Sequence, residues 1–152
     1  MAYRTVLLVV AEGVVVDSET NLVSLFNVLE EITPLGFPFL IPRLTVVATT
    51  QRDEGDPPVP ADCSMRFLLD QDLLLEAPAD INFRDRPRNR FKLTIGGLLI
   101  PRPGKLTVSL VVGGATLNSY AIAVRPAINP PAAAGGPAVP GAGPAQNPQN
   151  LG

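Results

Sequence analysis

Hydrophobic and polar residues alternate along most of the first 125 or so residues of the chain. The alternation is clearest in one run whose apolar members are Leu106, Val108, Leu110 and Val112. A period of two is expected of a half-buried strand. Gly104 before the run suits a sharp reversal, and Gly113-Gly114 after it suits a tight hairpin turn, because glycine tolerates positive φ. A second alternating run ends at Val124, so the pattern predicts a β-hairpin over residues 105–124.

Similar patterns predict further strands upstream, over residues 5–11, 39–50, 63–70 and 90–100, and a strand broken around Pro78 over residues 73–83. The run Thr5–Ala11 is apolar on both faces, which is typical of a central or covered strand. Residues 22–32 fit either a helix or a strand, and their β-branched neighbours favour the strand. About eight short strands with turn residues between them predict an all-β, antiparallel sandwich.

The end of the chain has a different composition. No residue from Ala127 to Gly152 is charged, and Pro, Gly, Ala, Asn and Gln dominate. Such a segment buries too little apolar surface to offset the conformational entropy lost on ordering. We therefore expect a sandwich domain over residues 1–126 and a disordered tail over residues 127–152.

Three segments carry a resemblance to a known family. They are "VVDSETNLVSLFNVLEEI", "FPFLIPRLTVVA" and "GLLIPRPGKLTVSLVVGGATLNSYAIAV". Together they resemble a bacterial family of small proteins known only as a domain of unknown function, number 6941, over roughly Val6–Val124. The resemblance implies an immunoglobulin-like or C2-like β-sandwich. It implies no activity, because the family has no catalytic residues to carry over.

The residue inventory argues against most enzymes. The chain has no histidine, which removes the imidazole base and the usual nitrogen-sulfur zinc sites, and we expect no cofactor. The single cysteine, Cys63, excludes an internal disulfide, and its position in a strand pattern predicts an inward-facing side chain. Neither a signal peptide nor a membrane-spanning run is recognisable, so we expect a cytoplasmic protein.

Charge is distributed unevenly along the chain. Residues 1–83 carry four arginines against thirteen acids, a balance of −9, while residues 84–152 carry eight bases against one acid, a balance of +7. Five of these bases occupy alternate positions and form a candidate anion-binding ladder, interrupted at Pro87: Arg84, Arg86, Arg88, Arg90 and Lys92. Nucleic acid is not the expected ligand, because the net charge is negative and no aromatic residues interleave with the arginines.

Two other interpretations of the charged loops stay open. If consecutive strands run up and down, the loops that contain residues 17–19, 53–62 and 84–90 share one end of the sandwich, and their charges would largely neutralise one another. Exposed ion pairs of that kind contribute only about 0–1 kcal/mol each. Alternatively, calcium, which takes six to eight oxygen ligands, would suit converging carboxylates. The candidate ligands are Asp17, Asp53, Asp56 and Asp62.

These observations favour a non-enzymatic binding or scaffold module that acts through protein–protein contacts, either with an unknown partner or by self-association. The two-faced strand Thr5–Ala11 and the segment "FPFLIP" are the apolar surfaces that such a contact would cover. A calcium- or anion-binding sandwich that uses the loops at one end is the alternative. An enzyme that uses carboxylates alone is the least favoured hypothesis, because acids adjacent in a strand point to opposite faces.

Overall fold

The computed structural model describes residues 3–128, which form nine strands and no helix. In chain order these are β1 (Arg4–Val16), β2 (Val23–Val28), β3 (Glu31–Ile32), β4 (Phe39–Gln51), β5 (Cys63–Leu69), β6 (Asp72–Pro78), β7 (Arg88–Ile100), β8 (Gly104–Val112) and β9 (Ala115–Val124). The all-β prediction is confirmed. The ambiguous segment at residues 22–32 is not helical, but it forms two short strands in different sheets rather than the single strand predicted. Within residues 3–128 no helix is long and apolar enough to span a membrane.

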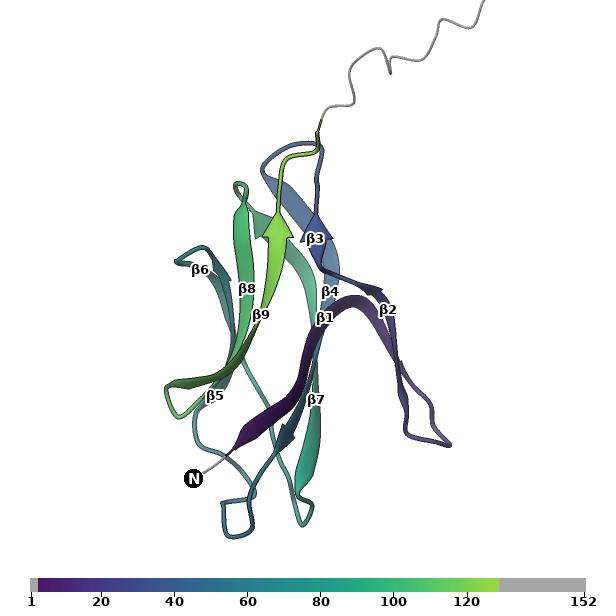
Figure 1. Cartoon of the computed structure of the whole chain (residues 1–152), viewed down its shortest axis with the longest axis vertical. Coiled ribbons are helices and arrows are strands. Elements are labelled where there is room, and N and C mark those ends of the chain that lie inside the picture. Colours follow the sequence, from purple (N-terminus) through teal and green to yellow (C-terminus); the bar gives the residue numbers. More distant parts are fainter. Residues whose placement is uncertain (1–2, 129–152) are drawn as a thin grey trace, which may run out of the picture.

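The strands form two packed sheets, as Figure 1 shows. One sheet has the order β2-β1-β4-β7, and the other has the order β3-β9-β8-β5-β6. All pairs are antiparallel except β3 with β9, which is parallel, so the sandwich is antiparallel with one exception at an edge. The core between the sheets includes Val10, Leu44, Phe67, Leu106 and Ile122, all fully buried. Each large apolar side chain buried in this way contributes about 1.5–3 kcal/mol to folding.

The predicted β8–β9 hairpin is present with its glycine turn. Gly113 and Gly114 have φ of 59° and 82°, the left-handed conformation that both central residues of such a two-residue turn require. Leu106, Val108 and Leu110 are fully buried, as the period of two predicts. Ser109 on the opposite face is also almost completely buried, and its hydroxyl lies 2.8 Å from that of Ser119 on β9.

Strand β1 belongs to two pairings. Its first part, Arg4–Ala11, pairs with β4, whereas its second part, Ala11–Val16, pairs with β2. The second part arches away from the sheet, so the β1–β2 hairpin folds back beside the outer face (Figure 1). Asn21, at the tip of this hairpin, accepts hydrogen bonds from Arg90 on β7, although β1 and β4 separate β2 from β7 in the sheet order. The hairpin therefore lies over the sheet rather than beside it.

The two-faced apolar pattern of Thr5–Ala11 is buried on both faces only in its second half. Leu8 and Val10 face the core between the sheets. Val9 and Ala11 alternate with them, so they face outward, yet they are buried, as is Val47 beside them on β4. The sequence predicted a central or interface-covered strand. β1 is an inner strand of its sheet, but Val6 and Leu7 are 50% and 45% exposed, so the apolar run is buried only over residues 8–11.

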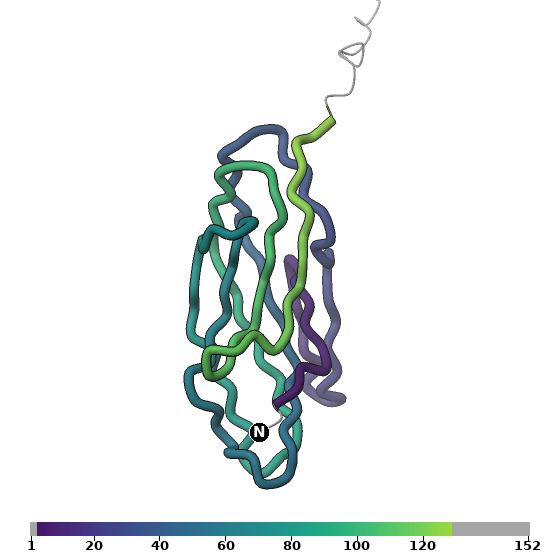
Figure 2. The backbone as a smooth tube through the Cα atoms, turned by 60° about the vertical axis from the view of Figure 1, so that its left-hand side comes forward, coloured from purple at the N-terminus to yellow at the C-terminus, as the bar shows by residue number. Residues whose placement is uncertain are grey.

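Three loops point towards the lower end of the sandwich, as the up-and-down order of the strands predicted, although the hairpin tip projects to one side of the other two (Figure 1). They are the hairpin tip at residues 17–22, the loop at residues 52–62 and the loop at residues 79–87 (Figure 2). Arg52 donates its backbone N–H to the Pro87 carbonyl at 2.9 Å, which joins the second loop to the third. The prediction that these three loops lie at the same end of the sandwich is confirmed.

The upper end of the sandwich contains the last described residues. Beyond β3 and β9 the two segments continue side by side, because Arg125 donates to the Ile32 carbonyl and Ala127 to the Pro34 carbonyl. Hydrogen bonding to the sandwich thus extends to residue 127, one residue past the predicted boundary. Residues 129–152, which make up most of the predicted disordered tail, lie outside the described residues.

Candidate functional site

The basic ladder divides into a strand part and a turn part. Arg88, Arg90 and Lys92 are exposed and alternate with buried Phe91, so they point outward from β7. Arg84 and Arg86 do not continue this line, because residues 84–87 form a turn and Arg84 has a φ of 54°. The prediction of one extended ladder is therefore correct for three residues and wrong for two.

The turn has local causes. The side-chain carbonyl of Asn82 accepts a hydrogen bond from the backbone N–H of Arg84 at 2.9 Å, and the Phe83 carbonyl accepts one from Arg86 at 2.9 Å. Asparagine favours such turns because its side chain bonds to the backbone two residues on. Pro87 has no backbone N–H to donate to a neighbouring strand. Strand β7 therefore begins at the next residue, Arg88.

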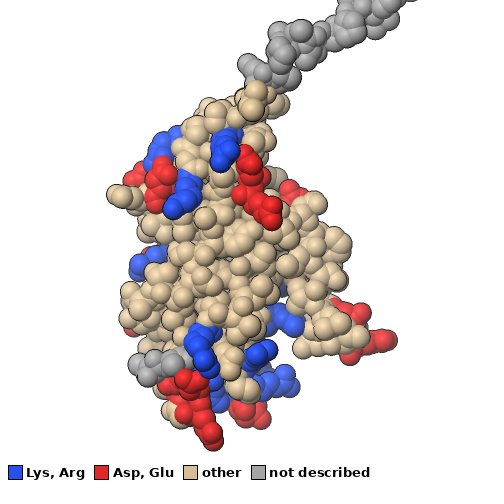
Figure 3. Space-filling model, viewed as in Figure 1, with Lys and Arg blue, Asp and Glu red and all other residues tan. Residues whose placement is uncertain are grey.

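All five predicted basic residues nevertheless line one open groove of about 910 Å³. Thr49 on β4 contributes to its floor together with Arg90 and Lys92, and Val16 and Asn21 of the β1–β2 hairpin form one wall. The loop at residues 80–87 closes the lower end and adds two carboxylates, Asp80 and Asp85. Figure 3 shows basic side chains in the hollow between the projecting hairpin and the lower body.

Arg90 spans this groove. Its guanidinium donates to the Asn21 backbone carbonyl at 2.9 Å and to the Asn21 side-chain oxygen at 3.3 Å. These bonds link β7 to the hairpin tip. Asn21 has a positive φ, 57°, at this point of the hairpin tip. Arg90 therefore holds the wall of the groove as well as contributing charge.

Charge neutralisation between the loops is only partial. Arg4 pairs with Asp53 at 2.9 Å at this end of the sandwich. Within residues 3–128, however, none of the five groove cations forms an ion pair with a carboxylate; the other pairs are Arg66–Glu76, Arg102–Asp70, Arg102–Asp72 and Arg125–Glu31. The loops share one end as expected, but the basic side chains of the ladder do not pair with the acidic ones.

Arg52 fixes the position of the turn at residues 84–87, and no pattern in the sequence pointed to this residue. Its guanidinium donates to the carbonyls of Asp56 at 2.7 Å, Arg84 at 3.2 Å and Arg86 at 3.2 Å. It also lies over the ring of Phe83, with the guanidinium carbon 5.8 Å from the ring centroid. Tyr3 stacks on the same ring at 5.9 Å between centroids. One arginine thereby ties the acidic loop to the basic turn.

The four candidate calcium ligands have other roles. Asp17 accepts the backbone N–H groups of Thr20 and Glu19, each at 2.8 Å, and these bonds lower the pKa of its carboxyl. Asp53 pairs with Arg4, and Asp56 accepts the Asp53 backbone N–H at 3.2 Å. Asp62 lies in a turn with a φ of 51°. Across residues 3–128 no three acidic or thiol side chains gather as a metal site would require, so the structure does not bring these four together.

Cys63 is half-buried, at the edge of the core rather than inside it. Met65 and Phe67, its partners in the alternation, are completely buried. The thiol points towards the Pro60 carbonyl, 3.7 Å away. Burial, and to a lesser extent the nearby Asp62 charge, raises the pKa of the thiol, which makes it a poor nucleophile at neutral pH. It borders a second open hollow of about 580 Å³, whose lining includes the Arg66–Glu76 ion pair.

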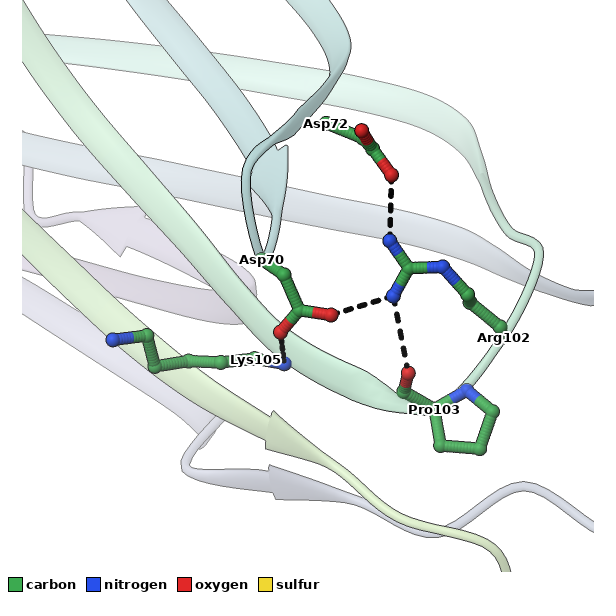
Figure 4. A network of polar contacts seen from close by, with 5 residues as sticks. All are labelled: Asp70, Asp72, Arg102, Pro103 and Lys105. Carbon is green, nitrogen blue, oxygen red and sulfur yellow. Dashed lines mark hydrogen bonds and ion pairs between the residues drawn. The ribbon is translucent and has the colours of Figure 1, made fainter.

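At the opposite end of the sandwich, Asp70 forms a network that the sequence did not reveal (Figure 4). Its carboxylate accepts the backbone N–H of Lys105 at 3.0 Å and a guanidinium N–H of Arg102 at 2.5 Å, and Arg102 also bonds to Asp72 at 2.6 Å. The Lys105 bond first, and Arg102 second, lower the pKa of Asp70. A Cβ at Gly104 would lie 2.7 Å from the Asp70 Oδ2, so a larger residue there would require this carboxylate to shift.

A family model described as a family of unknown function, DUF6941, matches residues 6–125. The chain belongs to the DUF6941 family. The match runs from β1 to the end of β9, so it includes the groove, both hollows and the Asp70 network, and it stops before the Pro/Gly/Ala-rich tail. No curated protein shows significant similarity to the chain. Membership in DUF6941 therefore brings no activity with it, and function has to be argued from the groove.

Proposed function

We propose that this protein is a non-enzymatic binding module that receives an acidic segment of a partner protein in the groove beside β7. The observation that carries the proposal is the set of five cations on one groove, none of which pairs with a carboxylate within residues 3–128. Two acids, Asp80 and Asp85, share the lining, so the basic residues are in excess. Cationic clusters of this kind attract and orient acidic partners.

The shape of the groove supports an extended partner segment. Its floor is a strand with three outward cations at every second position, and its wall is a second strand pair that stands over the sheet. Outward residues of one strand are spaced about 6.6–6.8 Å apart, which is also the spacing of alternate residues in an extended peptide. An acidic segment in extended conformation therefore matches the cations one to one.

Nucleic acid is a weaker fit to the same charges. Phe83 is the aromatic residue of the groove lining, but it is 2% exposed and its ring is occupied by Tyr3 and Arg52. Binding of single strands relies on aromatic faces that are free to stack on bases. The whole chain also carries a net charge of −2, which opposes a long polyanion away from the groove.

A cytoplasmic location belongs to the same proposal. It is supported by the single cysteine, which does not allow an internal disulfide, and by the half-buried state of that thiol. The proposal of a non-enzymatic role is supported by the absence of histidine from the sequence and by the structural use of Asp17, Asp53 and Asp56 in turns and ion pairs.

The proposal is tested by the binding of a dye-labelled oligoglutamate peptide, followed by fluorescence anisotropy at low and physiological salt. The triple variant Arg88→Gln/Arg90→Gln/Lys92→Gln is expected to bind at least about tenfold more weakly, and added salt should weaken the wild type. The matched control, Arg66→Gln/Lys105→Gln/Arg125→Gln, removes the same charge from the opposite sheet and its end. Equal losses in both variants would show that net charge, not the groove, governs binding.

A further inference from the structure

β7 lies at an edge of its sheet. It pairs with β4 on one side over residues 88–100, and within residues 3–128 no strand pairs with its other side. An edge strand presents a row of backbone N–H and C=O groups to which another extended chain can add. Natural proteins often keep such edges short, whereas β7 has 13 residues. Gly97, with a φ of 85°, bends its far end, so the regular part of the edge is residues 88–96.

The side chains of this edge alternate in chemistry. Arg88, Arg90 and Lys92 point outward and are exposed. Leu93 and Ile95 point inward, pack against the core and remain partly accessible. A strand added beside β7 would place its own alternate side chains about 4.5–5.5 Å from these residues, close enough for charge pairing on one face and apolar contact on the other.

Resting on the proposed function, we infer that the acidic segment binds by adding a strand to the free edge of β7. Acidic residues at every second position would face Arg88, Arg90 and Lys92, and apolar residues between them would contact Leu93 and Ile95. In this mode the backbone hydrogen bonds provide affinity, and the alternating side chains provide specificity. The ligand class is thus an extended acidic segment of a protein, with acidic and apolar residues in alternation.

The same cations select against other strands. Basic residues on an edge protect it from pairing with neutral or basic chains, because a strand that lacks acidic residues would leave them unpaired at close range. A second copy of β7 would place Arg88, Arg90 and Lys92 near their own equivalents, and like charges opposite one another destabilise a pair. The occupant that matches the charge pattern is therefore an acidic strand rather than a second copy of this edge.

The experiment compares peptides that share one composition. In the first, glutamate alternates with valine over about seven residues; in the second, the glutamates and the valines are grouped in two blocks. A third probe, oligoglutamate of equal charge, reports acidic binding without alternation. The alternating peptide is expected to bind the full-length protein at least about tenfold more tightly than the block peptide, and the Arg88→Gln/Arg90→Gln/Lys92→Gln variant should lose that advantage.

Backbone methylation of the alternating peptide tests the strand directly. N-methyl groups are placed either on all glutamate positions or on all valine positions, which leaves the charge unchanged. Because alternate N–H groups of a strand point to opposite sides, one methylated set faces β7 and the other faces solvent. One set should weaken binding at least about tenfold, while the other should change it less than about threefold. Hydrogen exchange of β7 amides between residues 88 and 96 should slow on binding.

The outcomes separate the inference from the proposed function. If alternating, block and oligoglutamate peptides bind equally and both methylated sets bind alike, strand addition is wrong and the acidic groove stands. If none of the three acidic peptides binds, both the proposed function and the inference of strand addition are wrong. Tight binding of the alternating peptide that is lost with only one methylated set supports both.

Discussion

Arg52 gives the sharpest test of how the lower loops are held. Its guanidinium bonds to the carbonyls of Asp56, Arg84 and Arg86 and lies over Phe83. The Asp56 bond is part-buried and worth about 1–1.5 kcal/mol, and the two exposed bonds are worth about 0.5 kcal/mol each. The cation–π contact adds about 0.5–1 kcal/mol. Arg52→Ala should therefore lower the free energy of unfolding by about 2.5–3.5 kcal/mol.

The assay is urea unfolding with linear extrapolation, supported by calorimetry. For a domain of this size the loss corresponds to a fall in Tm of about 3–5 °C per kcal/mol. Arg52→Lys keeps the charge but not the planar fork, so it should recover less than half of the lost stability. Arg4→Ala is the control, since its exposed pair with Asp53 is worth about 0–1 kcal/mol. A change below about 0.5 kcal/mol in Arg52→Ala, or full recovery with lysine, would refute the reasoning.

Three further predictions follow from the other end of the sandwich and from the thiol. Gly104→Ala should destabilise the protein by about 1–3 kcal/mol in urea unfolding, because its Cβ would lie 2.7 Å from the Asp70 Oδ2, and the effect should shrink when Asp70 is also alanine. The pKa of Asp70 is lower in the folded protein than its ordinary value of 3.8. The stability that this carboxylate provides is therefore complete above pH 3.8 and is lost as the pH falls through the folded pKa. Asp70→Asn should flatten the fall in the urea midpoint below about pH 4, and an unchanged slope would contradict this. Cys63, whose pKa is raised by burial, should react with iodoacetamide at neutral pH more slowly in the folded protein than in urea, as mass spectrometry would show; equal rates would contradict the assignment.

The sequence predicted those parts of the fold that depend on local pattern. The period of two in Leu106–Val112 and the pair Gly113-Gly114 specify a strand and a turn without any distant partner, and both were correct. The shared end of the three loops also followed, because up-and-down strands leave little freedom of placement. The two-residue β3 has too few residues to show a period, and its parallel pairing with β9 depends on a distant segment.

The candidate site was predicted in part. Arg88, Arg90 and Lys92 obey the strand period, but Asn82 and Pro87 give residues 84–87 a turn that a count of alternate positions ignores. The role of the β1–β2 hairpin as the groove wall was not predicted. The apolar pattern of Thr5–Ala11 suggests that a face of the strand is covered, but it does not identify the segment that covers it. Arg52 was missed for another reason. Its acceptors Arg84 and Arg86 lie 32 and 34 residues away in sequence, and a single arginine at the end of a strand has no local signature.

Because β1 is one continuous strand, the groove limits where residues can be inserted into it or deleted from it. Residues 4–11 belong to the sheet and residues 11–16 to the hairpin, so one unbroken strand supplies both the support and the wall above it. One residue inserted near Glu12 would reverse the facing of every later side chain in that strand and turn Val16 away from the lining. An insertion at the tip, among residues 18–20, would leave the facing of β1 intact. Insertions should therefore be tolerated at the hairpin tip, whereas an insertion near Glu12 should disrupt the groove.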